Sequence, residues 1–405
     1  MSKSTAVPQP NTDEVLLFLA SCQYSPDVLR TQLSNRSLES MYQTLEKMKK
    51  RHRWQSHFLI AGDSIYADRT GGLFDPIDPR ARYGQAYQEL NRRGSAWPLV
   101  RSRVNVESTI DDHEIDDNWE PLNEFSTEDG GKNIKKMLDG KYYFLKHIRK
   151  VQLSDRTASD EMPLWNSTEL DGLPLFLMDT RTEREGRTVK NWSTATLFDK
   201  VQKEALKAWL KNLDEDDNNN PDKPPVPKLI MSGSMLLPRR LKTAQDAQTI
   251  SSTLQSDSWD GYPASRHDLL AFIAEHQIRN VILLSGDEHL PCCCSFTLED
   301  SAQKTVTVHS IHGSPLYAPY RFANAHEHEF AGSEQFKIPK SATGPELTIQ
   351  TSTQYPRTED GYVQITIPKN GSQSVVEVQF IGHEGEQCYQ LALDQTPKTL
   401  LATDC

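Results

Sequence analysis

The sequence predicts an α/β fold with a β-rich C-terminal part, and three observations support this prediction. Short apolar runs alternate with helical patterns between Val15 and His289, and strand-like segments follow one another from Cys292 onward. Each of the early apolar runs is also followed directly by a cluster of polar residues. Alternating strands and helices form sheets with helices on their faces, and ligands bind beyond the carboxyl ends of such strands. We therefore expect the functional site at these strand ends.

The early strands are predicted from apolar runs that continue without the alternation of a half-exposed strand. Such runs indicate strands that are buried on both faces. They are Val15–Ala20, Phe58–Ala61, Pro174–Met178, Leu229–Met231 and Val281–Leu284. A further segment, Val104–Ile110, could be a short strand that leads into an acidic stretch.

The helices are predicted from apolar residues that recur at helical spacing. Five segments show this pattern: Leu38–Arg51, parts of Tyr83–Val100, Lys132–Val151, Leu197–Leu213 and Ser265–His276. Two segments are predicted as loops instead. These are Gly71–Arg82 and Asp214–Pro227, and the second is rich in Asp, Asn and Pro.

The C-terminal part of the chain is predicted to be mostly strand. Six segments carry this prediction: Cys292–Leu298, Thr305–Ile311, Leu347–Ser352, Tyr362–Ile367, Val375–Ile381 and Cys388–Leu393. The segment Asn324–Glu329 contains two histidines and two glutamates and looks like a metal-binding loop, but we expect it to be a solvated turn.

The composition is that of an ordinary globular protein. Of 405 residues, 36% are hydrophobic and 25% are charged. The formal net charge of −11 disfavours strong nonspecific binding to nucleic acid or to anionic membranes. No apolar run is long enough to span a bilayer, and Met1–Asp13 lacks the apolar core of a signal peptide. We therefore expect a cytoplasmic protein without a membrane span, with export left open.

The six cysteines do not have the spacing of a disulfide framework. They are Cys22, Cys292, Cys293, Cys294, Cys388 and Cys405. Three adjacent cysteines do not look like a disulfide framework, and in a strand Cys293 would face opposite to Cys292 and Cys294. We expect Cys292–Cys294 to be small buried apolar residues rather than a metal or redox site.

The most acidic stretch is Thr109–Trp119, which holds five carboxylates and one histidine. Carboxylates at this density repel one another unless a cation neutralises them. Hard cations take carboxylate oxygens, and borderline cations also take imidazole nitrogen. A solvated acidic loop is the alternative interpretation. Trp119 and the apolar run before the stretch favour partial burial, and therefore a metal.

Further groups with metal-binding side chains follow other predicted strands. Taken with the acidic stretch, they supply sulfur, oxygen and nitrogen from at least four strand ends. The residues in question are Cys22; Asp63 and Tyr66; Asp111, Asp112 and His113; and Asp287 and His289. Each side chain has a structural alternative on its own, such as a core cysteine or a packed aromatic ring. Their recurrence at successive strand ends favours a common site.

At five places the sequence resembles the alkaline phosphatase D (PhoD-like) family of the calcineurin-like metallophosphoesterases. The matching pieces are Ala20-Ser21-Cys22-Gln23, Gly62-Asp63-Ser64-Ile65-Tyr66-Ala67-Asp68, Asp111-Asp112-His113-Glu114, Asp179-Thr180-Arg181 and Ser285-Gly286-Asp287-Glu288-His289. The second and third pieces are specific to this group. The resemblance implies a four-layer α/β/β/α sandwich of mixed sheets. It also implies a catalytic domain over residues 1–340, with a β-rich extension over residues 341–405 packed against it.

The resemblance further implies a centre of two or more metal ions. Cys22 stands where the wider superfamily has its first metal-binding aspartate, Asp63 would bridge two ions, and Tyr66 would bind as a phenolate. Asp112 stands where the superfamily has a ligand asparagine. The full set of expected metal ligands is Cys22, Asp63, Tyr66, Asp111, Asp112, Asp287 and His289.

Two residues are expected to act on the substrate. The resemblance places His113 against the phosphoryl group, and Arg181 is the candidate for holding a phosphate oxygen, since guanidinium suits that geometry. Glu288 departs from the family pattern, which has a smaller apolar residue there. The expected reaction is hydrolysis of a phosphate ester, in particular a diester, by a metal-activated hydroxide. The natural substrate and the oligomeric state do not follow from the sequence.

Two rival functions remain open on sequence grounds. Cys22 could be the nucleophile of a thiol hydrolase with His113 or His289 as its base, but this leaves the carboxylates unexplained. Alternatively, the scaffold could belong to a non-catalytic binding protein. The identity of the metals is predicted from Cys22 and Tyr66, because thiolate and phenolate are anions that a trivalent cation stabilises most. We expect ferric iron with calcium, and zinc or manganese as the alternatives.

Overall fold

The computed structural model describes residues 14–24, 31–51, 56–69, 78, 80–121, 130–219, 225–241, 250–319, 324–356, 360–368, 375–383 and 385–393. Three parts of the sequence analysis fall outside the described residues. They are the segment Met1–Asp13, for which no signal peptide was predicted, much of the predicted loop Gly71–Arg82, and Cys405. Within the described part, no helix combines the length and the apolar character that crossing a membrane requires.

The described strands form two mixed sheets. The first sheet has the order β15 (Gly385–Ala392), β14 (Val375–Gly382), β13 (Gly361–Pro368), β1 (Glu14–Gln23), β2 (Ser56–Ala61) and β3 (Asn105–Thr109), with β10 (Ser314–Tyr317) beside β1. The second sheet has the order β11 (Glu334–Ile338), β12 (Leu347–Gln354), β8 (Cys292–Glu299), β9 (Thr305–His312), β7 (Val281–Ser285), β6 (Lys228–Met231), β5 (Leu173–Leu177) and β4 (Asn166–Leu170).

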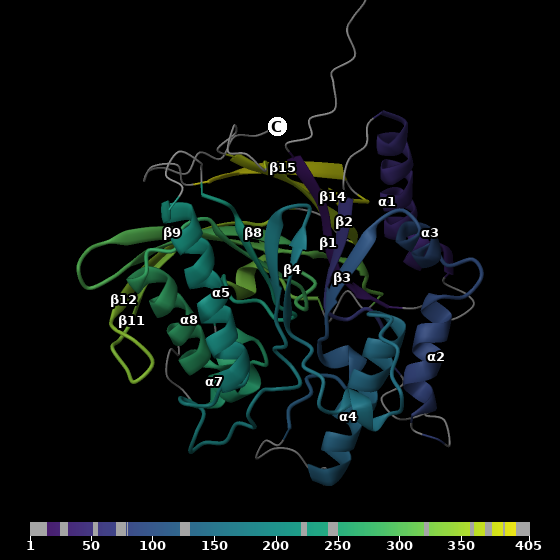
Figure 1. The fold of residues 1–405 in the computed structure, drawn as a ribbon, viewed down its shortest axis with the longest axis horizontal. Helices are drawn as coiled ribbons and strands as arrows, with labels where there is room; N and C mark the ends of the chain where they lie inside the picture. The colour runs from purple at the N-terminus through teal and green to yellow at the C-terminus, as the bar shows by residue number, and fades with distance from the viewer. Residues whose placement is uncertain are drawn as a thin grey trace, which may run out of the picture.

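Helices cover the outer faces of both sheets. The first group is α1 (Thr31–Arg51), α2 (Ala81–Leu90), α3 (Trp97–Arg101) and α4 (Gly130–His147). The second group is α5 (Lys200–Asn219), α7 (Ile250–Gln255) and α8 (Pro263–Glu275). Figure 1 shows the two groups on opposite sides of the strands. Short 3-10 helices are η1 (Asp112–Glu114), η2 (Thr157–Ser159), η3 (Trp259–Gly261) and η5 (Glu327–Glu329).

Strand β1 shows how the sequence specifies the layers. Successive side chains of a strand point to opposite faces. Leu16 and Phe18 pack with apolar residues of the helices that cover the first sheet, such as Met41. Leu17 points the other way and packs in a core shared with strands of the second sheet, where it joins Leu284. Both faces are therefore covered, which explains the unbroken apolar run and confirms the predicted α/β/β/α sandwich.

The C-terminal strands complete both sheets. β12 pairs antiparallel with β8 in the second sheet, and β13 pairs antiparallel with β1 in the first. The β-rich character of this part is confirmed. The division of the chain at residue 340 stays a prediction.

Several elements differ from their predictions. α5 continues to Asn219, so the start of the predicted loop Asp214–Pro227 is helical. The reason is tertiary: Asp217 lies 2.5 Å from the buried amino group of Lys228 and accepts a hydrogen bond from the backbone of Val226. Strands β4, β10 and β11 were not predicted. The cysteines Cys292–Cys294 are buried and form no disulfide, as expected.

Candidate metal centre

The predicted ligands lie at the carboxyl ends of β1, β2, β3 and β7: Cys22 is the residue of β1 before its last, Gln23, and the others follow their strands. Four of them, Cys22, Asp63, Asp287 and His289, have positive φ values of 54°, 55°, 85° and 54°. Residues with a Cβ rarely adopt this conformation, and each instance costs on the order of 1–3 kcal/mol. Such backbone persists only where the surrounding structure imposes it, and it concentrates at functional sites.

The structure brings side chains of β1, β2 and β7 together on one side of the site. The sulfur of Cys22 lies 3.4 Å from Asp63 Oδ2 and 3.7 Å from the backbone oxygen of Asp287. The hydroxyl of Tyr66 lies 3.0 Å from His289 Nε2. Residues 265 positions apart in the chain are thus neighbours. Thiol, carboxylate, phenol and imidazole meet here as the sequence analysis expected.

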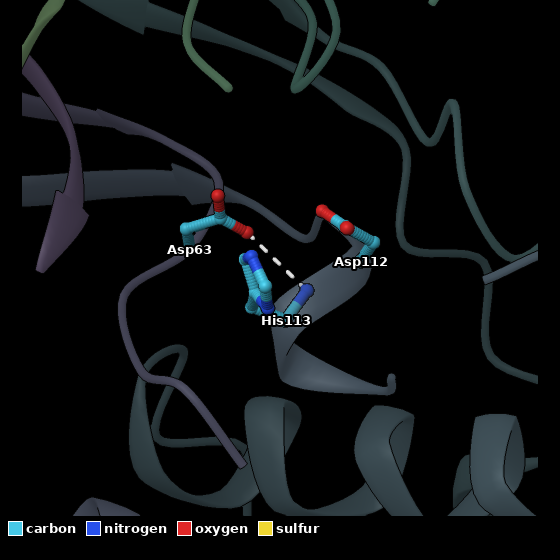
Figure 2. A group of neighbouring side chains, drawn as sticks. All are labelled: Asp63, Asp112 and His113. Carbon is cyan, nitrogen blue, oxygen red and sulfur yellow. Dashed lines mark hydrogen bonds between the residues drawn. The ribbon is translucent and has the colours of Figure 1, made fainter. Parts of the chain in front are cut away.

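The acidic stretch after β3 supplies the other side. One potential ligand atom from each of Asp63, Asp112 and His113 lies within 4.8 Å of the other two, and the same holds for Asp111, Asp112 and Asp287. Figure 2 shows the first group, in which the backbone N–H of His113 donates to Asp63 Oδ1 at 3.3 Å. Asp63 and Asp287 come from different sheets, so the site spans both.

Burial raises the pKa of the carboxyl groups that line the centre. The pKa of Asp63 is raised well above its usual value by burial and by Asp112, and that of Asp287 by burial and by Asp257. Burial raises the pKa of Asp111 to about 6. Asp112 is the exception: although burial opposes it, His113 and Arg181 lower its pKa to about 2.

Two oxygens in this cluster are buried without a hydrogen-bond partner among the described residues, Asp111 Oδ2 and Asp112 Oδ1. An unpartnered buried polar atom is costly, and a buried carboxylate more so. A cation at this position would satisfy both oxygens and offset the repulsion between the acids. The donor set therefore fits a metal centre.

His113 is held by a carboxylate that the sequence analysis gave no role. Its Nδ1 lies 2.8 Å from Asp68 Oδ2, and its ring lies on that of Tyr66 at a centroid distance of 4.0 Å. Burial alone would lower the pKa of His113. The negative groups Asp112, Asp63 and Asp68 outweigh burial and raise it well above its ordinary value.

Glu114 ties the two acidic loops together. Its carboxylate accepts hydrogen bonds from the backbone N–H groups of Asp63, Ser64 and Asp111 at 3.1, 2.5 and 2.9 Å. It also accepts the hydroxyl of Ser64 at 2.7 Å. Burial raises its pKa to about 7. These bonds fix the backbone that carries Asp63 and Asp111.

Arg181 is fully buried and lies between two carboxylates. Its Nε donates to Asp111 Oδ1 at 2.6 Å, and its Nη2 lies 2.5 Å from the same oxygen. Its Nη1 donates to Asp257 Oδ2 at 3.0 Å. The guanidinium thus holds Asp111 in place, and it also lies 3.6 Å from Asp112. A contact of Arg181 with phosphate stays a prediction.

The sequence and the fold have counterparts among known proteins. The sequence profile described as PhoD-like phosphatase matches residues 17–375, which is most of the chain. The chain belongs to the PhoD-like phosphatase family. As a PhoD-like phosphatase it is a phosphoesterase, as the sequence analysis expected.

A solved structure described as the structure of PhoD shares the fold. It matches this PhoD-like chain with a TM-score of 0.59 and 16% sequence identity, over 98% of this chain and 72% of that chain. At this level of identity the likeness concerns the fold alone. No match was found among curated proteins.

Three residues near the centre of this PhoD-like phosphatase were missed from the sequence. Asp68 lies within a matched piece, so its position next to Asp63 and Tyr66 was an available signal. Asp257 follows α7 and reaches Arg181, and Asn324 follows β10 and reaches His289. No sequence pattern marks Asp257. Asn324 begins the segment Asn324–Glu329, which resembled a metal-binding loop but was predicted to be a solvated turn.

Proposed function

We propose that this phosphoesterase is metal-dependent and hydrolyses phosphodiesters. The observation that carries the proposal is a pair of buried oxygens without a hydrogen bond to any described residue, one from Asp111 and one from Asp112, in a cluster of acids, imidazoles, a phenol and a thiol. Without a bound cation, burying these polar groups together would lower the stability of the folded protein with nothing to compensate for it. The family supports phosphate ester hydrolysis.

The proposed metal ligands are those of the sequence analysis. Asp63 has one oxygen near the thiol of Cys22 and the other near the acidic stretch, which supports a bridging role between two sites. Tyr66 and His289 would complete the side of Cys22. Asp111, Asp112 and Asp287 would form the carboxylate-rich side. Bound cations would supply Lewis-acid stabilisation of the phosphoryl oxygens and lower the pKa of a coordinated water.

We propose that His113 contacts the phosphoryl group and protonates the leaving oxygen. Against the effect of burial, Asp112, Asp63 and Asp68 raise the pKa of His113, and Asp68, which is not a proposed metal ligand, would still favour the protonated imidazole with metal bound. Asp68 accepts a hydrogen bond from Nδ1, which leaves Nε2 as the nitrogen that can donate to substrate. Nε2 of His113 lies 3.9 Å from Oδ1 of the exposed Asp117, so this nitrogen is on the solvent side of the ring.

Arg181 is proposed to contribute charge to the same region. Its closest partners are Asp111 and Asp257, so we propose that it acts on the substrate mainly by holding Asp111. The in-line attack on phosphorus requires the acids to stay in one arrangement, and a buried ion pair provides that.

The rival thiol hydrolase has less support. Nucleophilic cysteines need a lowered pKa and a neighbouring base. Burial and Asp63 instead raise the pKa of Cys22 well above its ordinary value. Among the described residues, its hydrogen-bonding neighbours are Ser21, Asp63, Tyr66 and the backbone of Asp287, and none of these is an imidazole. These surroundings suit a metal ligand.

We propose ferric iron at the side of Cys22 and Tyr66, and calcium at the carboxylate-rich side. The phenol and the thiol are both held in their neutral forms by burial, which raises both pKa values. A highly charged cation is what would release both protons, because it stabilises the anions most. Oxygen ligands alone suit a hard divalent ion. Zinc or manganese is the alternative composition.

The decisive experiment removes and restores the metals. Elemental analysis of purified protein would be followed by assays on bis(p-nitrophenyl) phosphate and p-nitrophenyl phosphate. We expect chelation to abolish turnover, metal to restore it, and the diester to be the better substrate. Cys22→Ser should weaken iron retention, with Cys388→Ser in the remote strand β15 as its matched control. Full activity of metal-free protein would refute metal dependence, and a preference for the monoester would refute the diester assignment.

A further inference from the structure

Asn324 makes a contact with the centre that the proposed mechanism does not use. Its side-chain oxygen lies 2.9 Å from Nδ1 of His289. An amide oxygen only accepts hydrogen bonds, so Nδ1 must be the nitrogen that carries the proton. The other ring nitrogen, Nε2, then has a free lone pair. It faces the hydroxyl of Tyr66 at 3.0 Å, which is the side where the other proposed ligands gather.

The chain around Asn324 is docked on the loop that carries His289. The backbone N–H of Ala325 donates to the carbonyl of Glu288 at 3.2 Å. Farther along, Arg240 bridges Glu288 and Glu329, and its guanidinium lies over the ring of Phe330. His289 itself has a positive φ, a conformation that needs support from its surroundings. The segment from Asn324 to Phe330 supplies such support on two sides.

We propose that Asn324 is a positioning residue that fixes the tautomer and orientation of His289, so that Nε2 is presented to the metal. This inference rests on the proposed metal-dependent function. Metal-binding histidines usually donate their other N–H to a fixed acceptor, and loss of that acceptor typically weakens metal binding about 10–100-fold. The segment Asn324–Glu329 therefore does more than form a solvated turn, although His326, Glu327 and His328 are exposed.

Two variants separate the hydrogen bond from the shape of the side chain. Asn324→Leu keeps the size and removes the acceptor, whereas Asn324→Asp keeps an acceptor oxygen in the same place. His328→Ala is the matched control, because it changes an exposed residue of the same segment. We expect Asn324→Leu to bind Zn²⁺ about 10–100-fold more weakly in competition with a chromophoric chelator. Asn324→Asp and His328→Ala should bind within about threefold of the unmodified protein.

The tautomer is measured without any metal. In metal-free protein labelled with ¹⁵N-histidine, the His289 signals are identified by their loss in His289→Gln. We expect the Nδ1–H tautomer in the unmodified protein and in Asn324→Asp, and its loss in Asn324→Leu. An Nε2–H tautomer in the unmodified protein would overturn the inference even if Asn324→Leu failed to fold. Equal Zn²⁺ affinity of Asn324→Leu and unmodified protein would overturn it as well. An unmodified protein that binds no metal would refute the proposed function instead.

Discussion

Replacing Arg181 by methionine should destabilise the metal-free protein severely. The side chains of Arg181 and Asp111 are both fully buried, and Nη2 and Nε both approach one carboxylate oxygen, at 2.5 and 2.6 Å. Methionine fills similar space and removes the charge, so Asp111 would be left buried without its cation. Breaking a buried pair in this way typically costs about 3–5 kcal/mol.

Asp257, the second partner of Arg181, contributes less to the loss of stability. Asp257 has 19% of its side chain exposed, so water can solvate its carboxylate when the guanidinium is removed. We therefore expect about 3–5 kcal/mol in total, which lowers the ratio of folded to unfolded protein by more than about 100-fold. The assay is urea unfolding of metal-free protein, followed by fluorescence of its tryptophans.

A double variant tests whether the stranded carboxylate is the cause. Adding Asp111→Asn to Arg181→Met replaces the unpaired charge by a neutral amide, and most of the lost stability should return. The reasoning is refuted if Arg181→Met unfolds at the same urea concentration as the unmodified protein. If Arg181→Met also raises the KM for bis(p-nitrophenyl) phosphate, the guanidinium binds phosphate, as the sequence analysis expected.

Five further predictions concern the centre itself. Asp63→Asn should lose metal together with activity; full metal occupancy by elemental analysis would contradict the bridging role. His113→Ala should lower kcat by about 10²–10⁴ at near-normal metal content, and an unchanged kcat would exclude His113 from the reaction. Asp68→Asn should lower kcat less and move the basic limb of the pH profile to lower pH, because Asp68 raises the pKa of the proposed acid His113. An unaltered profile would separate Asp68 from His113. Burial raises the pKa of Asp111 to about 6 in the folded protein, so folded protein binds more protons than unfolded protein. The melting temperature of metal-free protein should therefore fall as pH rises from about 4 to 6, and a rise over that interval would contradict the assignment. If iron is bound by Tyr66, concentrated protein should be coloured and Tyr66→Phe should bleach or shift the band, whereas colourless, iron-free, active protein would exclude iron.

The strands that are buried on both faces were predictable from the sequence. Val15–Ala20 and Val281–Leu284 are unbroken apolar runs because each lies between a helical layer and the facing sheet. β4 (Asn166–Leu170) was missed because four of its five residues are polar, as its position at the edge of the second sheet allows. The acidic end of α5 was misjudged because Lys228, a residue of another element, stabilises it.

The site was predictable to the extent that one short segment contains the relevant residues. Asp111, Asp112 and His113 are consecutive, and their strand end places them together. The partners of Arg181 could not be inferred, since Asp257 is brought to it by a separate loop. The same holds for Asn324, whose contact with His289 depends on how two distant loops dock.

The pairing of β1 has a consequence for the order in which the protein can be made. This strand carries Cys22 and lies beside β10 and β13, whose residues are 314–317 and 361–368. A ribosome has released the thiol-bearing strand long before either partner is synthesised. The first sheet stays incomplete on that side until nearly the whole chain has emerged, so we expect metal to enter only after translation ends. A nascent chain arrested before residue 361 should hold no stable metal.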